Sequence, residues 1–107
     1  MIERLEAIEK RYNELTEQLM SNEVISDIKK TLELTKEQAG LRDGFEIYNK
    51  YKKIVSDIEA AREMTKDPEM AEFAREELES LNAEKEQIEK DIEIILLPKD
   101  PNDGKNV

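Results

Sequence analysis

Apolar side chains recur three or four positions apart along most of this chain, a spacing that predicts amphipathic helices packed against one another. The first such row lies within residues 2–20 and consists of Leu5, Ile8, Tyr12, Leu15 and Leu19. Residues with this spacing share one side of a helix, so they form a stripe that would face a neighbouring helix. The row predicts a first helix over residues 2–20.

The row is interrupted at residues 21–27, which include two serines, an asparagine and an aspartate. Short polar side chains of this kind bond to nearby backbone groups, which favours turns and helix caps over helix interiors. We therefore expect the chain to reverse here and a short helical segment to follow over residues 26–34. Ser26 would cap that segment, and Ile28 and Leu32 would face inward one turn apart.

A second helix start, or a kink, is indicated at residues 35–38, where the order Thr-Lys-Glu-Gln matches a capping box. From there we predict a long helix over residues 35–66 with two apolar stripes, which indicate contact with two neighbouring helices. The stripes are formed by Leu41, Phe45, Tyr48, Val55 and Ile58, and by Ile47, Tyr51, Ile54 and Ala61. Gly40 and Gly44 each cost about 1 kcal/mol relative to alanine inside a helix, so we expect a bend or fraying in its early turns.

Asp67 and Pro68 mark the next boundary, because aspartate caps helices and proline is well tolerated at the first helical position. A third helix is predicted over residues 68–97, with a length of roughly 45 Å at 1.5 Å per residue. Its row of three-four spacing runs through Ala74, Leu78, Leu81, Lys85, Ile88, Ile92 and Ile95. Two further prolines and a glycine then end the helix, so residues 98–107 are expected to be an extended linker toward a missing second domain.

Together these elements predict an all-α fold, with residues 1–97 as a helical N-terminal domain. The expected architecture is an antiparallel helical bundle, or a coiled-coil-like long helical hairpin with a shorter N-terminal helix packed on it. Charged residues make up 41% of the 107 positions and hydrophobic residues 37%, with three glycines and three prolines. That balance favours long amphipathic helices around thin apolar seams over a compact mixed fold.

The chain contains neither cysteine nor histidine. It therefore lacks the usual thiolate nucleophile, the commonest general base and the common zinc ligands. We expect no catalytic, cofactor-binding or metal-binding residues, no cofactor, and no enzymatic activity. A net charge of −10 argues against general affinity for nucleic-acid backbones, which requires clustered lysine and arginine. No apolar run reaches the roughly 18 residues of a membrane span, so we expect no membrane partner and a cytoplasmic location.

Two charged segments remain as candidate contact surfaces. Residues 67–97 contain eleven acidic and three basic residues, a net charge of −8, which is either a docking face or an ordinary solvated face. Residues 48–53 interleave tyrosines with lysines, a composition that can stack bases and contact phosphates. Because Tyr48 falls on an apolar stripe, packing of its ring inside the fold is the favoured interpretation. The polar order at residues 100–104 does not match a calcium-binding loop and indicates a solvated turn.

Five stretches of the sequence are similar to the opening of the bacterial class I peptide chain release factors of the release factor 1 type. They are residues 2–12 (IERLEAIEKRY), 23–27 (EVISD), 34–38 (LTKEQ), 48–52 (YNKYK) and 96–107 (LLPKDPNDGKNV). The first four are compatible with many helices, but the last is distinctive, and in this family it leads directly into a second domain. The resemblance covers nearly the whole chain, so we expect it to be part of a longer protein.

The resemblance implies a role in translation termination, in which the whole factor directs peptide release at UAG and UAA stop codons. The family's stop-codon tripeptide and its Gly-Gly-Gln motif for hydrolysis match no position here, so no functional residue is carried over. The family's first domain is a helical bundle that projects toward the stalk base of the large ribosomal subunit, near the site of a GTPase release factor. The implied function is a ribosome-docking and factor-contact module.

From the residues alone, a second interpretation stays open. The chain would then be a free-standing coiled-coil oligomerisation or adaptor protein, whose apolar stripes bind copies of itself. Both interpretations are compatible with a dimer that forms through an exposed apolar stripe. A self-assembling adaptor would lose helicity on dilution, because its stripes would depend on partner chains.

Overall fold

The computed structural model describes residues 2–97, and within this range every regular element is a helix. The helices are α1 (Ile2–Leu19), α2 (Asn22–Ile25), α3 (Ile28–Met64) and α4 (Ala71–Leu96). The predicted all-α class, with a long helical hairpin and a shorter N-terminal helix packed on it, is confirmed. The linker predicted over residues 98–107 lies outside the described residues.

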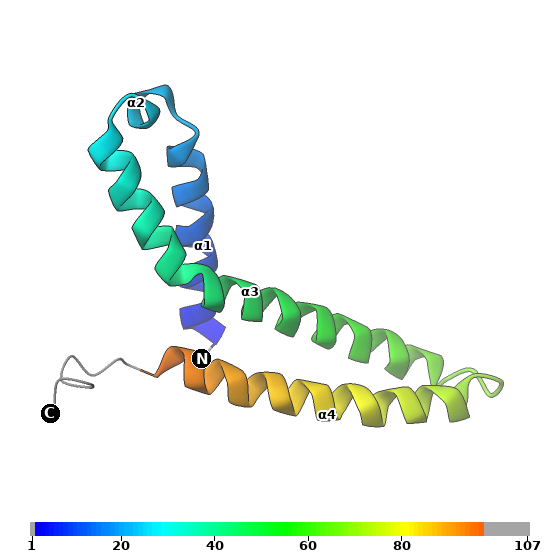
Figure 1. Ribbon diagram of the computed structural model, residues 1–107. Helices are drawn as coiled ribbons and strands as arrows, with labels where there is room; N and C mark the ends of the chain where they lie inside the picture. The colour runs from blue at the N-terminus through cyan, green and yellow to red at the C-terminus, as the bar shows by residue number, and fades with distance from the viewer. Residues whose placement is uncertain (1, 98–107) are drawn as a thin grey trace, which may run out of the picture.

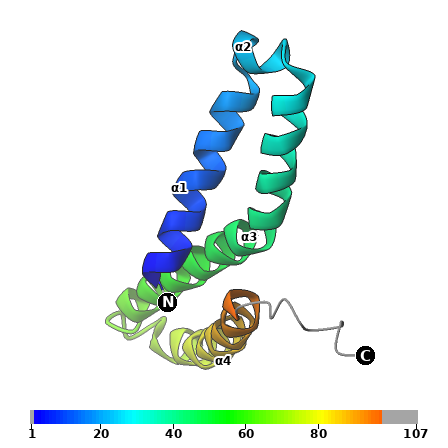
Figure 2. The same cartoon turned by 90° about the vertical axis from the view of Figure 1, so that its left-hand side faces the viewer.

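The helices form an L, in which the 37-residue helix α3 belongs to both arms. Figure 1 shows α1 running antiparallel beside the first half of α3, and α4 running antiparallel beside the second half. Figure 2 shows the same two hairpins after a quarter turn. The extents of 60, 44 and 17 Å describe a thin molecule. We call the α1–α3 hairpin with α2 the first arm, the α3–α4 hairpin the second arm, and their junction the elbow.

Two apolar clusters hold the L together. The elbow cluster joins three helices through the buried residues Leu5, Ile47, Tyr48, Ile92 and Leu96. The tip cluster lies at the α2 end of the first arm and consists of the buried residues Leu15, Val24 and Leu34. Leu5, Leu15 and Ile92 are fully buried. The apolar rows predicted from the sequence are therefore satisfied in large part within one chain.

The predicted helix start at Thr35 is wrong, because α3 begins at Ile28 and continues through this position without interruption. Its cap is Asp27, whose carboxylate accepts a hydrogen bond from the backbone amide of Lys30 at 3.1 Å. Ser26, the predicted cap, lies one residue too early for this geometry. The capping box does not form because residues 35–38 lie inside α3, where no helix terminus needs a cap, and Gln38, its second member, instead donates hydrogen bonds to α1. A tertiary contact has replaced the local one.

Ile28 and Leu32 do not face inward as predicted, since 75% and 65% of their surfaces are exposed. The first half of α3 turns Leu34 toward α1 instead, where Leu34 is buried in the tip cluster. Leu32 precedes Leu34 by two residues, which places it about 160° away around the helix. The prediction therefore placed the wrong side of the helix toward α1 in this segment.

The predicted start of the last helix at Pro68 is also displaced, because α4 begins at Ala71. Residues 65–70 form a tight reversal between α3 and α4. Asp67 supports this turn by accepting a hydrogen bond from the backbone amide of Glu69 at 2.9 Å. Its side chain therefore stabilises the loop of the hairpin rather than the first turn of the helix.

The bend predicted near Gly40 and Gly44 is present, but without fraying, since α3 is helical throughout Ile28–Met64. Figure 1 shows the change of direction in the green part of α3, at the elbow. Gly44 is buried there, and a Cβ atom added to it would lie 2.9 Å from Cδ1 and 3.2 Å from Cγ2 of Ile8. Gly44 thus allows α1 to approach the backbone of α3 closely. Gly40 has no such role, because an added Cβ would meet open space.

Candidate interaction surfaces

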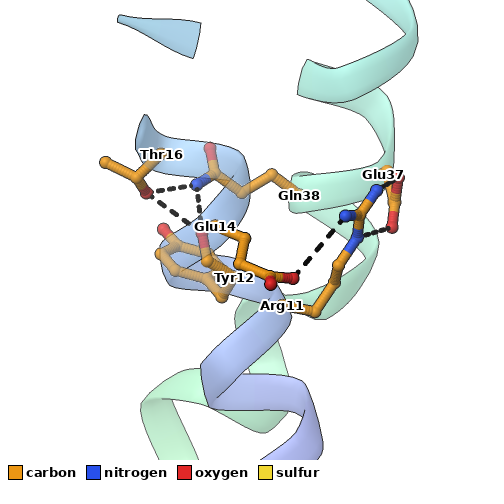
Figure 3. Close-up of polar contacts among 6 residues, drawn as sticks. All are labelled: Arg11, Tyr12, Glu14, Thr16, Glu37 and Gln38. Atoms are coloured by element: carbon orange, nitrogen blue, oxygen red, sulfur yellow. Dashed lines mark hydrogen bonds and ion pairs between the residues drawn. The ribbon is translucent and has the colours of Figure 1, made fainter. Parts of the chain in front are cut away.

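A group of polar side chains joins α1 to α3 midway along the first arm (Figure 3). Arg11 donates from Nε and Nη2 to the two carboxylate oxygens of Glu37, at 2.6 and 2.8 Å. Gln38 donates from Nε2 to the backbone oxygen of Tyr12 at 3.1 Å and to Thr16 Oγ1 at 2.6 Å. We call these five residues the polar latch. Paired donors and acceptors at fixed positions set the register of α1 on α3.

The latch has the electrostatics of a structural contact. Hydrogen bonding to Arg11 holds the pKa of Glu37 below its ordinary value, and the same bonds raise the pKa of Arg11. Glu14 also lies near Arg11, at 3.7 Å. About two fifths of the Arg11 and Glu37 side chains is exposed, so water screens the pair and its contribution to stability is small.

The pKa shift leads to a prediction about pH. Because the folded-state pKa of Glu37 is lowered, its contribution to stability is present above the unfolded pKa, about 4.3, and is lost as pH falls through the folded pKa. Glu37→Gln should therefore lower the melting temperature slightly at neutral pH and leave it unchanged at strongly acidic pH. Thermal melts at both pH values check this, with Glu33→Gln as the matched control. An equal deficit of Glu37→Gln at both pH values would contradict a charge-dependent latch.

The tyrosines of residues 48–53 pack within the fold, as the favoured interpretation predicted, while the lysines of this segment are exposed. Tyr48 is buried in the elbow cluster and Tyr51 lies against it. Lys52 lies over the Tyr48 ring, with 4.7 Å from Nζ to the ring centre, and pairs with Glu9 at 2.5 Å. The Tyr48 ring is therefore engaged by protein on its accessible side. These contacts favour a structural role over base stacking for this segment.

The acidic residues of α4 mostly point into solvent along the second arm. One ion pair within α4 joins Lys85 to Glu89 at 3.4 Å, and Gln87 donates to Asp91 at 3.1 Å. Over residues 2–97, no three acidic, cysteine or histidine side chains are gathered in a way that could hold a metal ion. The acidic side chains of α4 therefore form an ordinary solvated face, which gives this surface a negative electrostatic potential.

Two hollows on the second arm, both formed by described residues, do not have the form of a small-molecule site. The space between α3 and α4 near Ile58 and Lys85 has a volume of about 130 Å³, below the roughly 300–1,000 Å³ of ligand pockets. A wider hollow of about 470 Å³ is formed by neighbouring turns of α3 alone, around Glu59 and Arg62, and opens to solvent. In the described part of the chain, no helix is long and apolar enough to cross a membrane.

The free end of the first arm carries an apolar surface that the sequence did not predict. Four large apolar side chains are exposed where α1, α2 and α3 meet: Met20, Ile25, Ile28 and Leu32. We call this group the apolar tip. Ile28 and Leu32 are four residues apart, so their pair was visible in the sequence, but it was assigned to the core. Several exposed apolar side chains in one place commonly mark a site of macromolecular contact.

Comparison with known proteins assigns the chain to a family. Residues 8–107 match the PCRF domain. The whole chain is 49% identical over 111 residues to peptide chain release factor 1 of Lactococcus lactis subsp. cremoris, 50% identical over 110 residues to that of Enterococcus faecalis, and 46% identical over 110 residues to that of Oceanobacillus iheyensis. The chain spans 31% of the length of each. No solved structure matches it.

The resemblance noted in the sequence is confirmed by these matches, which extend over the entire chain and not only over the five quoted stretches. The apolar tip, the polar latch and the elbow all lie in the region that aligns with these relatives. With 100 of its 107 residues matched by the family, the chain belongs to the PCRF domain family.

Proposed function

We propose that this chain is the N-terminal domain of a translation termination factor that directs peptide release at UAG and UAA stop codons. The observation that carries the proposal is the identity of about half of all positions, over the full chain, to proteins named peptide chain release factor 1. Within such a factor the domain docks on the ribosome and contacts other factors. Decoding and hydrolysis belong to other domains, and the factor works in the cytoplasm.

The shape of the molecule supports a docking role over a catalytic one. The first arm ends in exposed apolar side chains, and the elbow that orients this arm is a packed three-helix junction. A rigid arm that presents an apolar end is suited to contact at a distance from the rest of a protein. We propose the stalk base of the large ribosomal subunit as the docking site and a GTPase release factor as a second partner.

The alternative, a self-assembling coiled-coil adaptor, makes a different prediction. Its apolar rows would need partner chains, whereas Leu5, Leu15 and Ile92 are fully buried within one chain. We therefore expect the helical content to stay constant when the protein is diluted from about 100 μM to about 1 μM. Far-UV circular dichroism measures this directly. A loss of helicity on dilution would favour the adaptor.

Subunit binding tests the docking proposal. The purified chain, labelled with a fluorophore at an added C-terminal cysteine, is mixed with isolated large or small ribosomal subunits from a bacterium, and the anisotropy is recorded. We expect saturable binding to the large subunit and none to the small subunit. Equal binding to both subunits, or binding to neither, would contradict the docking proposal. Far-UV circular dichroism of the labelled chain serves as the folding control.

A further inference from the structure

A second exposed row continues from the apolar tip along the first half of α3. It consists of Ile28, Leu32, Thr35 and Ala39, which are spaced four, three and four residues apart and are all exposed. The α1-facing residues Leu34 and Leu41 lie on another side of the helix. We call the exposed row the docking stripe. It has the spacing with which one helix receives another, and no helix of the described residues covers it.

Basic side chains flank the docking stripe. Residues 28–42 contain four basic and two acidic residues, a net charge of +2 in a chain of net charge −10. One of the two acidic residues, Glu37, is neutralised by its bidentate pair with Arg11. Lys29, Lys36 and Arg42 are exposed and form no ion pair with any residue of the described range 2–97. The stripe thus combines the large apolar side chains Ile28 and Leu32 with two small ones, and cations without an ion-pair partner in the described range lie beside it.

We infer that the docking stripe binds an acidic amphipathic helix of a partner protein. An apolar row with three-four spacing accepts the apolar face of a helix, as in helix-in-groove recognition. The flanking cations select a partner with carboxylates beside its apolar face, because complementary charge adds specificity and speeds encounter. Ile25, at the end of α2, supplies a further exposed apolar contact at the tip. The inference rests on the proposed docking function and gives it a partner of defined chemistry.

Protein fits the stripe better than RNA does. Ile28 and Leu32 are among the most exposed large apolar side chains of the described chain, and they contribute nothing to contacts with phosphates. The stripe also carries no aromatic ring on which a base could stack. Tyr12 and Phe45, the aromatic pair of the first arm, stack on each other with 4.0 Å between ring centres. A second copy of the chain is another candidate occupant, since α4 is acidic, and the test separates it.

The test measures binding of defined probes to the full 107-residue chain by fluorescence anisotropy, without ribosomes, so that this inference and the docking proposal can fail separately. The first probe is a designed peptide of about 20 residues with leucines at three-four spacing and glutamates elsewhere. The second has lysines in place of the glutamates, and the third is a single-stranded RNA of similar length. We expect the acidic peptide to bind at least about tenfold more tightly than either other probe.

Variants of the stripe sharpen the result. The double change Ile28→Gln and Leu32→Gln should weaken binding of the acidic peptide at least about tenfold, whereas Ile94→Gln, at an equally exposed apolar position of α4, should leave it unchanged. The charge reversal Lys29→Glu and Lys36→Glu should reverse the preference, so that the basic peptide binds more tightly. A merely structural role of these residues would not reverse it. Circular dichroism confirms that each variant is folded, as expected for exposed positions.

Three outcomes would overturn the inference. Preference for the RNA would assign the cations to phosphate binding, and equal affinity for both peptides would show that the flanking charges select nothing. Sedimentation of the chain as a dimer that Ile28→Gln and Leu32→Gln dissociate would assign the stripe to a second copy. None of these outcomes would alter the expectation that the chain binds the large ribosomal subunit.

Discussion

Leu5→Ala is expected to lower the free energy of unfolding by about 2–5 kcal/mol, the usual cost of removing a buried leucine side chain. Leu5 is fully buried and packs with Ile47 and Ile92 in the elbow cluster. Truncation therefore leaves a cavity where three helices meet and few neighbours can collapse to fill it. Urea denaturation followed by far-UV circular dichroism gives the change.

Two control variants make the Leu5 result interpretable. Ile94→Ala, at a position that is 67% exposed, should change the free energy of unfolding by no more than about 0.5 kcal/mol. Ile92→Val removes one methylene from the same cluster and should cost about 0.5–1.5 kcal/mol, which keeps the measurement possible should Leu5→Ala not fold. If Leu5→Ala and Ile94→Ala had equal effects, the elbow would not be a packed junction.

Gly44→Ala and Gly40→Ala should change stability in opposite directions. Alanine is favoured over glycine inside a helix by about 1 kcal/mol, and Gly40→Ala should gain most of this because its Cβ meets open space. The Cβ of Gly44→Ala would lie 2.9 and 3.2 Å from atoms of Ile8. Cδ1 ends a flexible side chain and can rotate away, but Cγ2 is bonded to Cβ of Ile8, so α1 itself must shift to relieve that contact. The cost should therefore lie in the upper part of the about 1–3 kcal/mol range of overpacking, which exceeds the gain, and we expect a net loss of about 1–2 kcal/mol. Chemical denaturation of both variants measures the difference.

A double-mutant cycle identifies the cause of the Gly44→Ala loss. Ile8→Val removes Cδ1, the atom closest to the added Cβ, but leaves Cγ2 in place. In the Gly44→Ala background it should therefore restore part of the lost stability, whereas in the parent chain it should cost a little. Additive effects of the two changes, or equal stability of Gly40→Ala and Gly44→Ala, would show that close approach of α1 at the elbow is not what requires the glycine.

Helices held by long regular rows could be predicted from the sequence, because burial repeats with the helical period. Leu5 and Leu15 in the first row and Ile92 in the last are the three fully buried large side chains, and all three were assigned to stripes. Gly44 was also correctly linked to a bend in α3. The two stripes of α3 correctly indicated two neighbouring helices, but periodicity does not say which neighbour each turn meets, so the division of α3 between α1 and α4 along its length could not be predicted.

The errors lie where local and tertiary interactions compete. The residues from Thr35 to Gln38 have the order of a capping box, but Gln38 bonds to Tyr12 and Thr16 of α1 instead. Ile28 and Leu32 have inward spacing, but the phase of α3 is set by Leu34 in the tip cluster. The exposed apolar tip and the docking stripe were missed for this reason. An apolar row predicts a contact, and only the fold shows whether the partner belongs to the same chain.

A chimera tests most directly whether the chain is the N-terminal domain of a factor acting in peptide release. The matching region of Lactococcus lactis peptide chain release factor 1, to which the chain is 49% identical over 111 residues, is replaced by this chain, and peptide release is measured at UAG, UAA and UGA codons. We expect release at UAG and UAA close to that of the unchanged factor, and above that of a factor lacking the region. A folded chimera no more active than the deletion would contradict it.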